Sequence, residues 1–136
     1  MKHPGCISHF SSMRNRELMR AFRRAMAGAH HIVLPEVCKT AANTPCSRFW
    51  VSEERALFVV SSMLKGQYVL DNMKPLKCEM YLEIYKRTLA LRTEQPDLSL
   101  SDAVFFSVNS PAPKFYMTPQ SVLQIVWRIK IGHYKS

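Results

Sequence analysis

Apolar residues recur at helical spacing in six segments of the chain. In the first of these segments Leu18, Phe22, Ala25 and Met26 lie on one face, which predicts an amphipathic helix. The six predicted helices span about 13–27, 34–42, 53–65, 75–92, 100–108 and 119–131. Glycines at 28, 66 and 132 follow three of these segments and predict C-terminal stops. The pattern therefore predicts an all-α protein.

One short stretch between two of the predicted helices occurs twice. Residues 45–52, PCSRFWVS, return as residues 111–118, PAPKFYMT. The similarity extends upstream and downstream through the flanking helical segments, which indicates an internal duplication with a period of roughly 65 residues. Ser52 and Thr118 lie where the third helix of each repeat begins, and both residue types are favoured helix N-caps.

The duplication predicts two tandem three-helix units in pseudo-twofold relation. We expect a flexible N-terminal segment at 1–12, repeat unit one at 13–66, a linker at 67–75 and repeat unit two at 76–136. The two units are expected to share one core, because each is very small. Residues 48–51 and 114–117 are aromatic and close to proline, and could pair as a minimal two-stranded ribbon.

Charge is the main sequence signal about function. The chain has 19 Lys and Arg residues against 10 acids, a formal charge of +9, which favours a polyanionic partner such as nucleic acid or an anionic membrane surface. Divided by sequence halves, residues 1–66 carry +6 and residues 67–136 carry +3. The alternative is a basic soluble protein with no such partner.

Other classes of partner and site find less support in the sequence. No window approaches the roughly 18 apolar residues of a membrane span, and the N-terminus has no signal-like apolar core, so we expect a cytoplasmic protein without a membrane partner. The four cysteines form no CxxC pair and fit no zinc spacing, which predicts reduced, structural thiols and no metal. No catalytic motif or phosphate-binding glycine loop occurs, so neither an enzyme nor a cofactor is expected.

The favoured function is therefore non-enzymatic nucleic-acid binding, with duplex DNA favoured over RNA. The second and third helices of each repeat are separated by a turn, as in helix-turn-helix proteins, although this connection is longer than usual. Basic helix faces would contact phosphates, and polar side chains of the last helix would contact base edges. The candidate residues are Arg16, Arg20, Arg23, Arg24, Arg48, Lys86, Arg87, Lys114, Gln120, Ser121, Gln124 and Arg128.

Two alternatives stay open at this stage. Arg48 and Lys114 could clamp phosphates, or could stack on the neighbouring Trp50 and Tyr116 as cation–π partners. The second alternative is a protein-interaction or scaffold module, including a homo-oligomer, that uses an aromatic patch on repeat unit two. The patch residues are Phe105, Phe106 and Trp127, which would form an interface if exposed and part of the core if covered.

Overall fold

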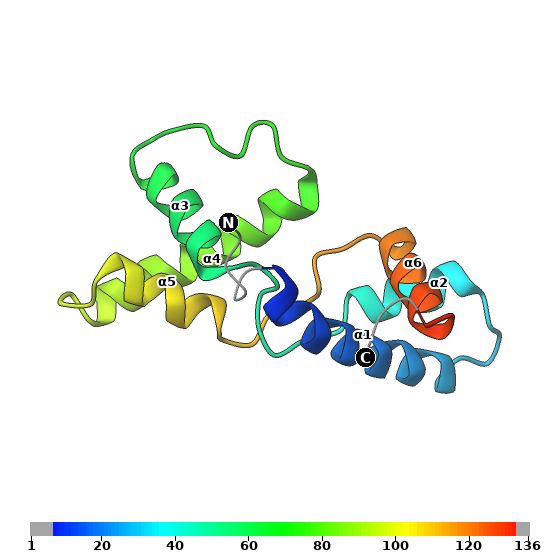
Figure 1. Cartoon of the computed structure of the whole chain (residues 1–136). Helices are drawn as coiled ribbons and strands as arrows, with labels where there is room; N and C mark the ends of the chain where they lie inside the picture. Colours follow the sequence, from blue (N-terminus) through cyan, green and yellow to red (C-terminus); the bar gives the residue numbers. More distant parts are fainter. Residues whose placement is uncertain (1–6, 133–136) are drawn as a thin grey trace. The chain divides into compact units, whose positions relative to one another are not determined.

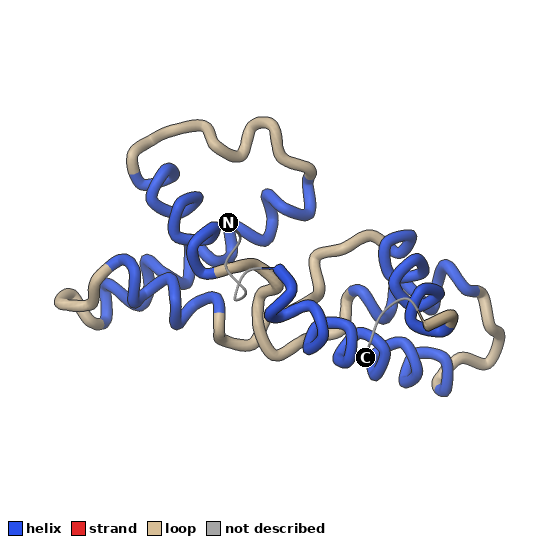
Figure 2. The backbone as a smooth tube through the Cα atoms, viewed as in Figure 1, coloured by secondary structure: helices blue, strands red, loops and turns tan. Residues whose placement is uncertain are grey.

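The computed structural model describes residues 7–132, and six helices make up its regular structure. The helices are α1 (Ile7–Ala27), α2 (Leu34–Ala42), α3 (Glu53–Leu64), α4 (Pro75–Glu94), α5 (Leu100–Val108) and α6 (Pro119–Lys130) (Figure 1). No strand forms within the described range (Figure 2). The all-α class predicted from the sequence is thus confirmed.

The first helix begins earlier than predicted. It starts at Ile7 rather than at Met13, and Phe10 in its second turn is buried. The expectation of a flexible segment at 1–12 is therefore wrong over 7–12, because Phe10 supplies an apolar contact that the sequence pattern did not reveal. Residues 1–6 of that segment lie outside the described residues.

The helix ends follow local sequence chemistry. The hydroxyl oxygens of Ser52 and Thr118 accept hydrogen bonds from the amides of Arg55 and Ser121, each at 3.1 Å, which confirms both predicted N-caps. Gly66 follows the last turn of α3 with a φ of +76°, a conformation that glycine adopts without a steric penalty. Helix boundaries are thus set largely by neighbouring residues.

The helices group into two compact units that do not follow their order in the chain. The discontinuous unit comprises residues up to Cys46 together with those from Ala112 onward, and contains α1, α2 and α6. The continuous unit is Ser47–Pro111 and contains α3, α4 and α5. The helices predicted as the third of each unit, α3 and α6, are therefore grouped with the first two helices of the other predicted unit.

This grouping changes the expected helix-turn-helix pairing. Among the described residues α2 packs against α1 and α6 in one unit, and α3 packs against α4 and α5 in the other. The connection 43–52 carries the chain from one compact unit into the other, so consecutive helices are separated. A helix-turn-helix made of α2 and α3 is consequently not formed.

Each unit has its own apolar interior. In the discontinuous unit α1, α2 and α6 bury Leu18, Val37, Cys38 and Val122. Burial raises the pKa of the Cys38 thiol, which keeps it protonated and unreactive. The continuous unit buries residues from all three of its helices, which include Val59, Val60, Ile84, Val104 and Val108, together with Phe49 from the preceding segment.

The predicted ribbon is wrong. Residues 48–51 and 114–117 form no strand, and the pairing is a single antiparallel bridge between Cys46 and Ala112, with N···O distances of 3.0 and 2.9 Å. The amide of Phe49 instead donates to Val108 at the end of α5, and the amide of Phe115 donates to Ala42 at the end of α2. Because helix C-terminal carbonyls take these two amides, neither amide takes part in a ladder between the aromatic segments.

Candidate nucleic-acid interface

The two compact units differ sharply in charge. The described part of the discontinuous unit, residues 7–46 and 112–132, contains nine Lys and Arg residues and two acids. The continuous unit contains eight of each. Among the described residues, all of the excess positive charge therefore belongs to α1, α2, α6 and the segments that flank them, a separation that division by sequence halves does not reveal.

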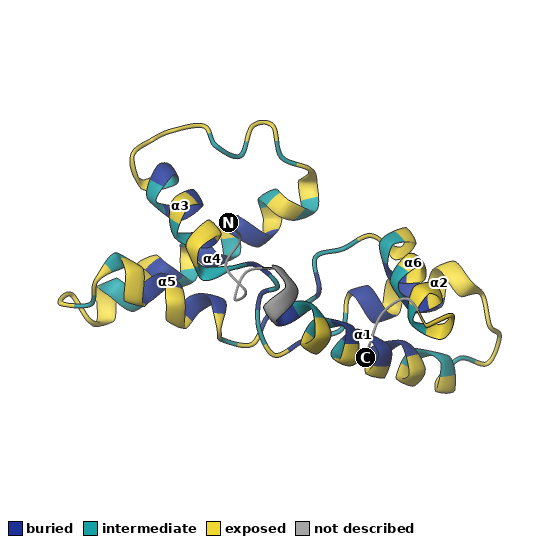
Figure 3. Ribbon diagram, in the orientation of Figure 1, coloured by how far each residue is buried: buried dark blue, intermediate teal, exposed yellow. Residues whose placement is uncertain are grey.

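An arginine stripe runs along the exposed side of α1. Arg16, Arg20 and Arg23 recur at helical spacing and are exposed, while Leu18 and Phe22 are buried. Figure 3 shows exposed and buried positions along the same helix. Arg24 is also exposed and lies at the edge of this stripe. Three or four guanidinium groups are thus presented to solvent from one rigid helix, as a surface that contacts successive phosphates would require.

The exposed face of α6 carries three of the polar residues predicted from the sequence. Gln120, Gln124 and Arg128 are exposed. Ser121 is half-buried, and its amide and hydroxyl both bond to the Thr118 hydroxyl, so it serves the helix cap. The Nζ atom of Lys130 lies 5.9 Å from the ring centroid of Phe22, which brings the last turn of α6 to α1. Sequence reasoning missed Lys130, although its place near the helix C-terminus is a signal available in the sequence.

The guanidinium of Arg48 is bonded within the continuous unit. Its guanidinium donates to the carbonyls of Phe49 at 2.9 Å and Val51 at 2.6 Å, and lies 3.7 Å from the carboxylate of Glu53. Only 11% of its side chain is exposed. Burial lowers the pKa of Arg48 and Glu53 acts in the opposite direction. Arg48 is therefore a poor candidate for phosphate contact, because the segment 49–53 already takes its donors.

Both cation–π contacts considered from the sequence are present. The Arg48 guanidinium lies 5.9 Å from the Trp50 ring centroid, and the Lys114 ammonium lies 5.6 Å from that of Tyr116. Tyr116 adopts a φ of +57°, which is uncommon for a residue other than glycine. Lys114 belongs to the basic unit, so it contributes to the positive charge of that unit while it also contacts the Tyr116 ring.

Arg87 joins three segments of the continuous unit. Its Nε donates to Glu83 at 2.9 Å, and its Nη1 donates to the Ser110 hydroxyl at 3.0 Å and to the carbonyl of Pro111. The guanidinium carbon also lies 4.9 Å from the ring centroid of the buried Phe49. The neighbouring Lys86 is exposed, but both residues lie in the unit without net charge. Arg87 is therefore a poor candidate for phosphate contact.

The hydrogen bonds of the Arg87 guanidinium predict that Arg87→Ala destabilises the protein by about 2 kcal/mol, because charge-assisted hydrogen bonds to the segment that follows α5 are lost. Lys86→Ala is the matched control on the same helix, and we expect it to change stability by less than about 0.5 kcal/mol. Urea unfolding followed by circular dichroism measures both. Equal midpoints for the two variants would show that the Arg87 contacts do not stabilise the fold.

The aromatic residues predicted as one patch are exposed, and they belong to two different compact units. Phe105 and Phe106 on α5 are 49% and 54% exposed, and their ring centroids lie 5.8 Å apart in an edge-on arrangement. Trp127 on α6 is 61% exposed and belongs to the other compact unit. The reading of these residues as core is therefore wrong, because all three lie on the outward sides of their helices.

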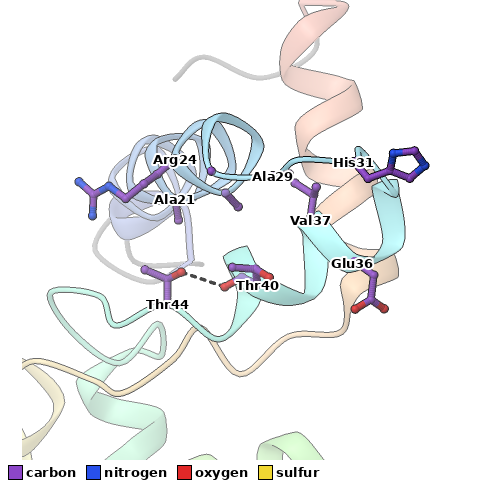
Figure 4. A pocket seen from close by; sticks show the side chains of 10 residues that line it. Ala21, Arg24, Ala29, His31, Glu36, Val37, Thr40 and Thr44 are labelled. Atoms are coloured by element: carbon purple, nitrogen blue, oxygen red, sulfur yellow. Dashed lines mark hydrogen bonds between the residues drawn. The ribbon is translucent and has the colours of Figure 1, made fainter.

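A cleft of about 360 Å³ lies where the end of α1 meets α2. Ala21, Ala29 and Val37 line it, while the charged side chains of Arg24 and Glu36 point away from its centre (Figure 4). The Thr44 hydroxyl donates to the Thr40 carbonyl at 2.9 Å and so is used within the backbone. The cleft thus offers an apolar wall without converging polar groups.

Comparison with known proteins gives no match among protein families, curated proteins or solved structures. No helix within residues 7–132 has the length and apolar character needed to cross a bilayer. In the same range no three His, Cys, Asp or Glu side chains gather where they could hold a metal ion. Function must therefore be argued from charge and exposed side chains.

Proposed function

We propose that the protein binds nucleic acid through its discontinuous unit. The observation that carries the proposal is the uneven charge: nine basic residues against two acids in the described part of this unit, and eight against eight in the other. A folded surface with this excess attracts polyanions over a distance of about 10 Å at moderate salt. Nucleic acid is the polyanion whose closely spaced phosphates suit several cations on one rigid helix.

The spacing of the arginine stripe supports this proposal. Arg16 and Arg23 are separated by seven positions of α1, which corresponds to about 10 Å along the helix axis. Nucleic acid presents several phosphates over such a length. Arg20 lies between them, so the three side chains can reach different phosphates at once. Contacts to bases would come from α6, whose Gln120 and Gln124 carry both donors and acceptors.

The two units are, we propose, products of one duplication in which the third helices are exchanged. The helices are 21, 9 and 12 residues long in the first half of the chain, and 20, 9 and 12 in the second. The backbone hydrogen bond from Phe49 to Val108 has a counterpart from Phe115 to Ala42. The interval in sequence from Phe49 to Phe115 equals the interval from Ala42 to Val108. After such a duplication, the copies diverged in charge while they kept the same capping and bonding pattern.

Fluorescence anisotropy of labelled oligonucleotides across a salt series tests nucleic-acid binding directly. We expect affinity to fall steeply as salt rises, with a logarithmic slope of about −0.7 to −0.9 for each phosphate contacted. Vesicles that contain anionic lipid serve as the competing polyanion. No nucleic-acid binding at low salt, or binding to the vesicles alone, would overturn the proposal.

A protein-interaction role is the second candidate, supported by Phe105 and Phe106 on the unit without net charge. Two copies of that unit can approach without the repulsion that two basic units would suffer. We expect the double change Phe105→Ser and Phe106→Ser to abolish self-association measured by sedimentation, with the helical content unchanged. A wild-type protein that is monomeric at high concentration would contradict self-association.

A further inference from the structure

We propose that α6 stacks on unpaired bases, so that the nucleic acid bound by the discontinuous unit is single-stranded. This inference rests on the proposed function and specifies the substrate class of the same site. It replaces the expectation of duplex DNA, which rested on helix-turn-helix units whose second and third helices, α2 with α3 and α5 with α6, fall into different compact units. Its basis is an apolar stripe on the most basic part of the molecule.

The stripe consists of Leu123, Trp127 and Ile131, which follow one another at intervals of four residues. Residues at this spacing lie one above the other on a helix, so their side chains form a continuous strip along α6 and its C-cap. Their exposed fractions are 37%, 61% and 47%, although Val122 and Val126 on the opposite face are buried. α6 is therefore apolar on its outer side as well as on its core side.

Polar and basic residues border this stripe. Gln120 and Gln124 precede Trp127 on the exposed face, and Arg128 and Lys130 follow it, both exposed. A base stacked on the indole would have amide groups within reach of its edge and cations close to its phosphates. The net positive charge of the unit attracts the strand, and the apolar stripe provides the contact that charge alone cannot.

A duplex is a poor occupant of this surface. In a double helix the faces of the bases are stacked on each other, and the grooves present mainly polar edges. Three large apolar side chains against those edges would gain little and would displace water from polar groups. Unpaired bases offer their apolar faces, and stacking on aromatic side chains is the usual way in which proteins hold them.

The other third helix indicates that the fold does not require this stripe. α3 has the same length as α6 and also begins at a hydroxyl cap. Its corresponding positions hold Leu57, Ser61 and Lys65, so a serine stands where α6 has Trp127. α3 lies in the unit without net charge. The exposed tryptophan therefore accompanies the positive charge, as binding of a single strand requires.

Tryptophan fluorescence and anisotropy together test the inference. The chain has two tryptophans, so a signal present in the wild type and absent in Trp127→Phe belongs to Trp127. We expect oligothymidine to quench this emission, and Trp127→Ala to weaken oligothymidine binding about 10-fold while leaving the affinity for a hairpin duplex unchanged. Trp127→Phe, which retains a ring, should lose less affinity. Phe58 is an exposed aromatic residue of the neutral unit, so Phe58→Ala is the matched control. It should change neither the affinity for oligothymidine nor the affinity for the hairpin.

The possible failures are distinguishable. If both nucleic acids bind with salt dependence but Trp127→Ala weakens neither, or weakens both equally, stacking on unpaired bases is wrong and the proposed function stands. Tighter binding of the hairpin than of oligothymidine would also overturn the single-strand assignment. If neither nucleic acid binds at low salt, the proposed function itself fails. Trp127 is exposed, so its substitution should leave the fold intact, which circular dichroism checks.

Discussion

Replacing Arg16, Arg20 and Arg23 together by glutamine is expected to weaken nucleic-acid binding about 100-fold at about 0.1 M salt, because each lost phosphate contact removes the counterion release that accompanies it. The salt dependence should flatten at the same time, by about 2 to 3 in the logarithmic slope if all three side chains contact phosphates. Anisotropy titrations at several salt concentrations measure both quantities. All three residues are exposed, so helicity should be preserved.

A matched control removes the same charge from the other unit. Lys65, Lys77 and Lys86 are exposed lysines of the continuous unit, and replacing all three by glutamine lowers the net charge by the same amount. We expect this variant to bind within about threefold of the wild type, because these lysines belong to the unit without net charge and are not part of the proposed site. Equal losses in the two triple variants would mean that total charge, rather than the α1 stripe, determines binding.

Phe49→Ala should produce the largest loss of stability, about 3–5 kcal/mol, because it empties a fully buried position. Phe49 lies in the segment before α3, beneath the guanidinium of Arg87, and its amide is bonded to the end of α5. Its loss therefore affects the links between α3, α4 and α5. Chemical denaturation followed by circular dichroism gives the free energy of unfolding.

Hydrogen exchange then identifies which unit is affected. Amides of α4 and α5 should lose protection in Phe49→Ala while those of α1 and α2 retain it, since the two groups of helices form separate compact units. Phe58→Ala serves as the control, because Phe58 is exposed on α3 and its loss should cost less than about 1 kcal/mol. Equal loss of protection throughout the chain would show that the two units unfold as one.

Part of the candidate site could be predicted from residue type and spacing alone. The arginines of α1 recur at helical intervals beside an apolar face, which places them on the solvent side. The same helical spacing predicts that Gln120, Gln124 and Arg128 lie on the solvent side of the last helix, and all three are exposed. Arg48 and Arg87 could not be separated from them by sequence, because their donors are satisfied by carbonyls and a carboxylate whose positions depend on packing. A cation in a sequence has no recognisable partner until the chain is folded.

The sequence by itself determined the elements of this protein: six helices, most of their ends and the hydroxyl caps of α3 and α6. These depend on periodicity and on contacts between residues a few positions apart. Only the tertiary structure decided which helices pack together, because several amphipathic helices of similar length can cover the same apolar faces. That choice joins α6 to α1 and α2, and so concentrates the positive charge of the chain in one unit.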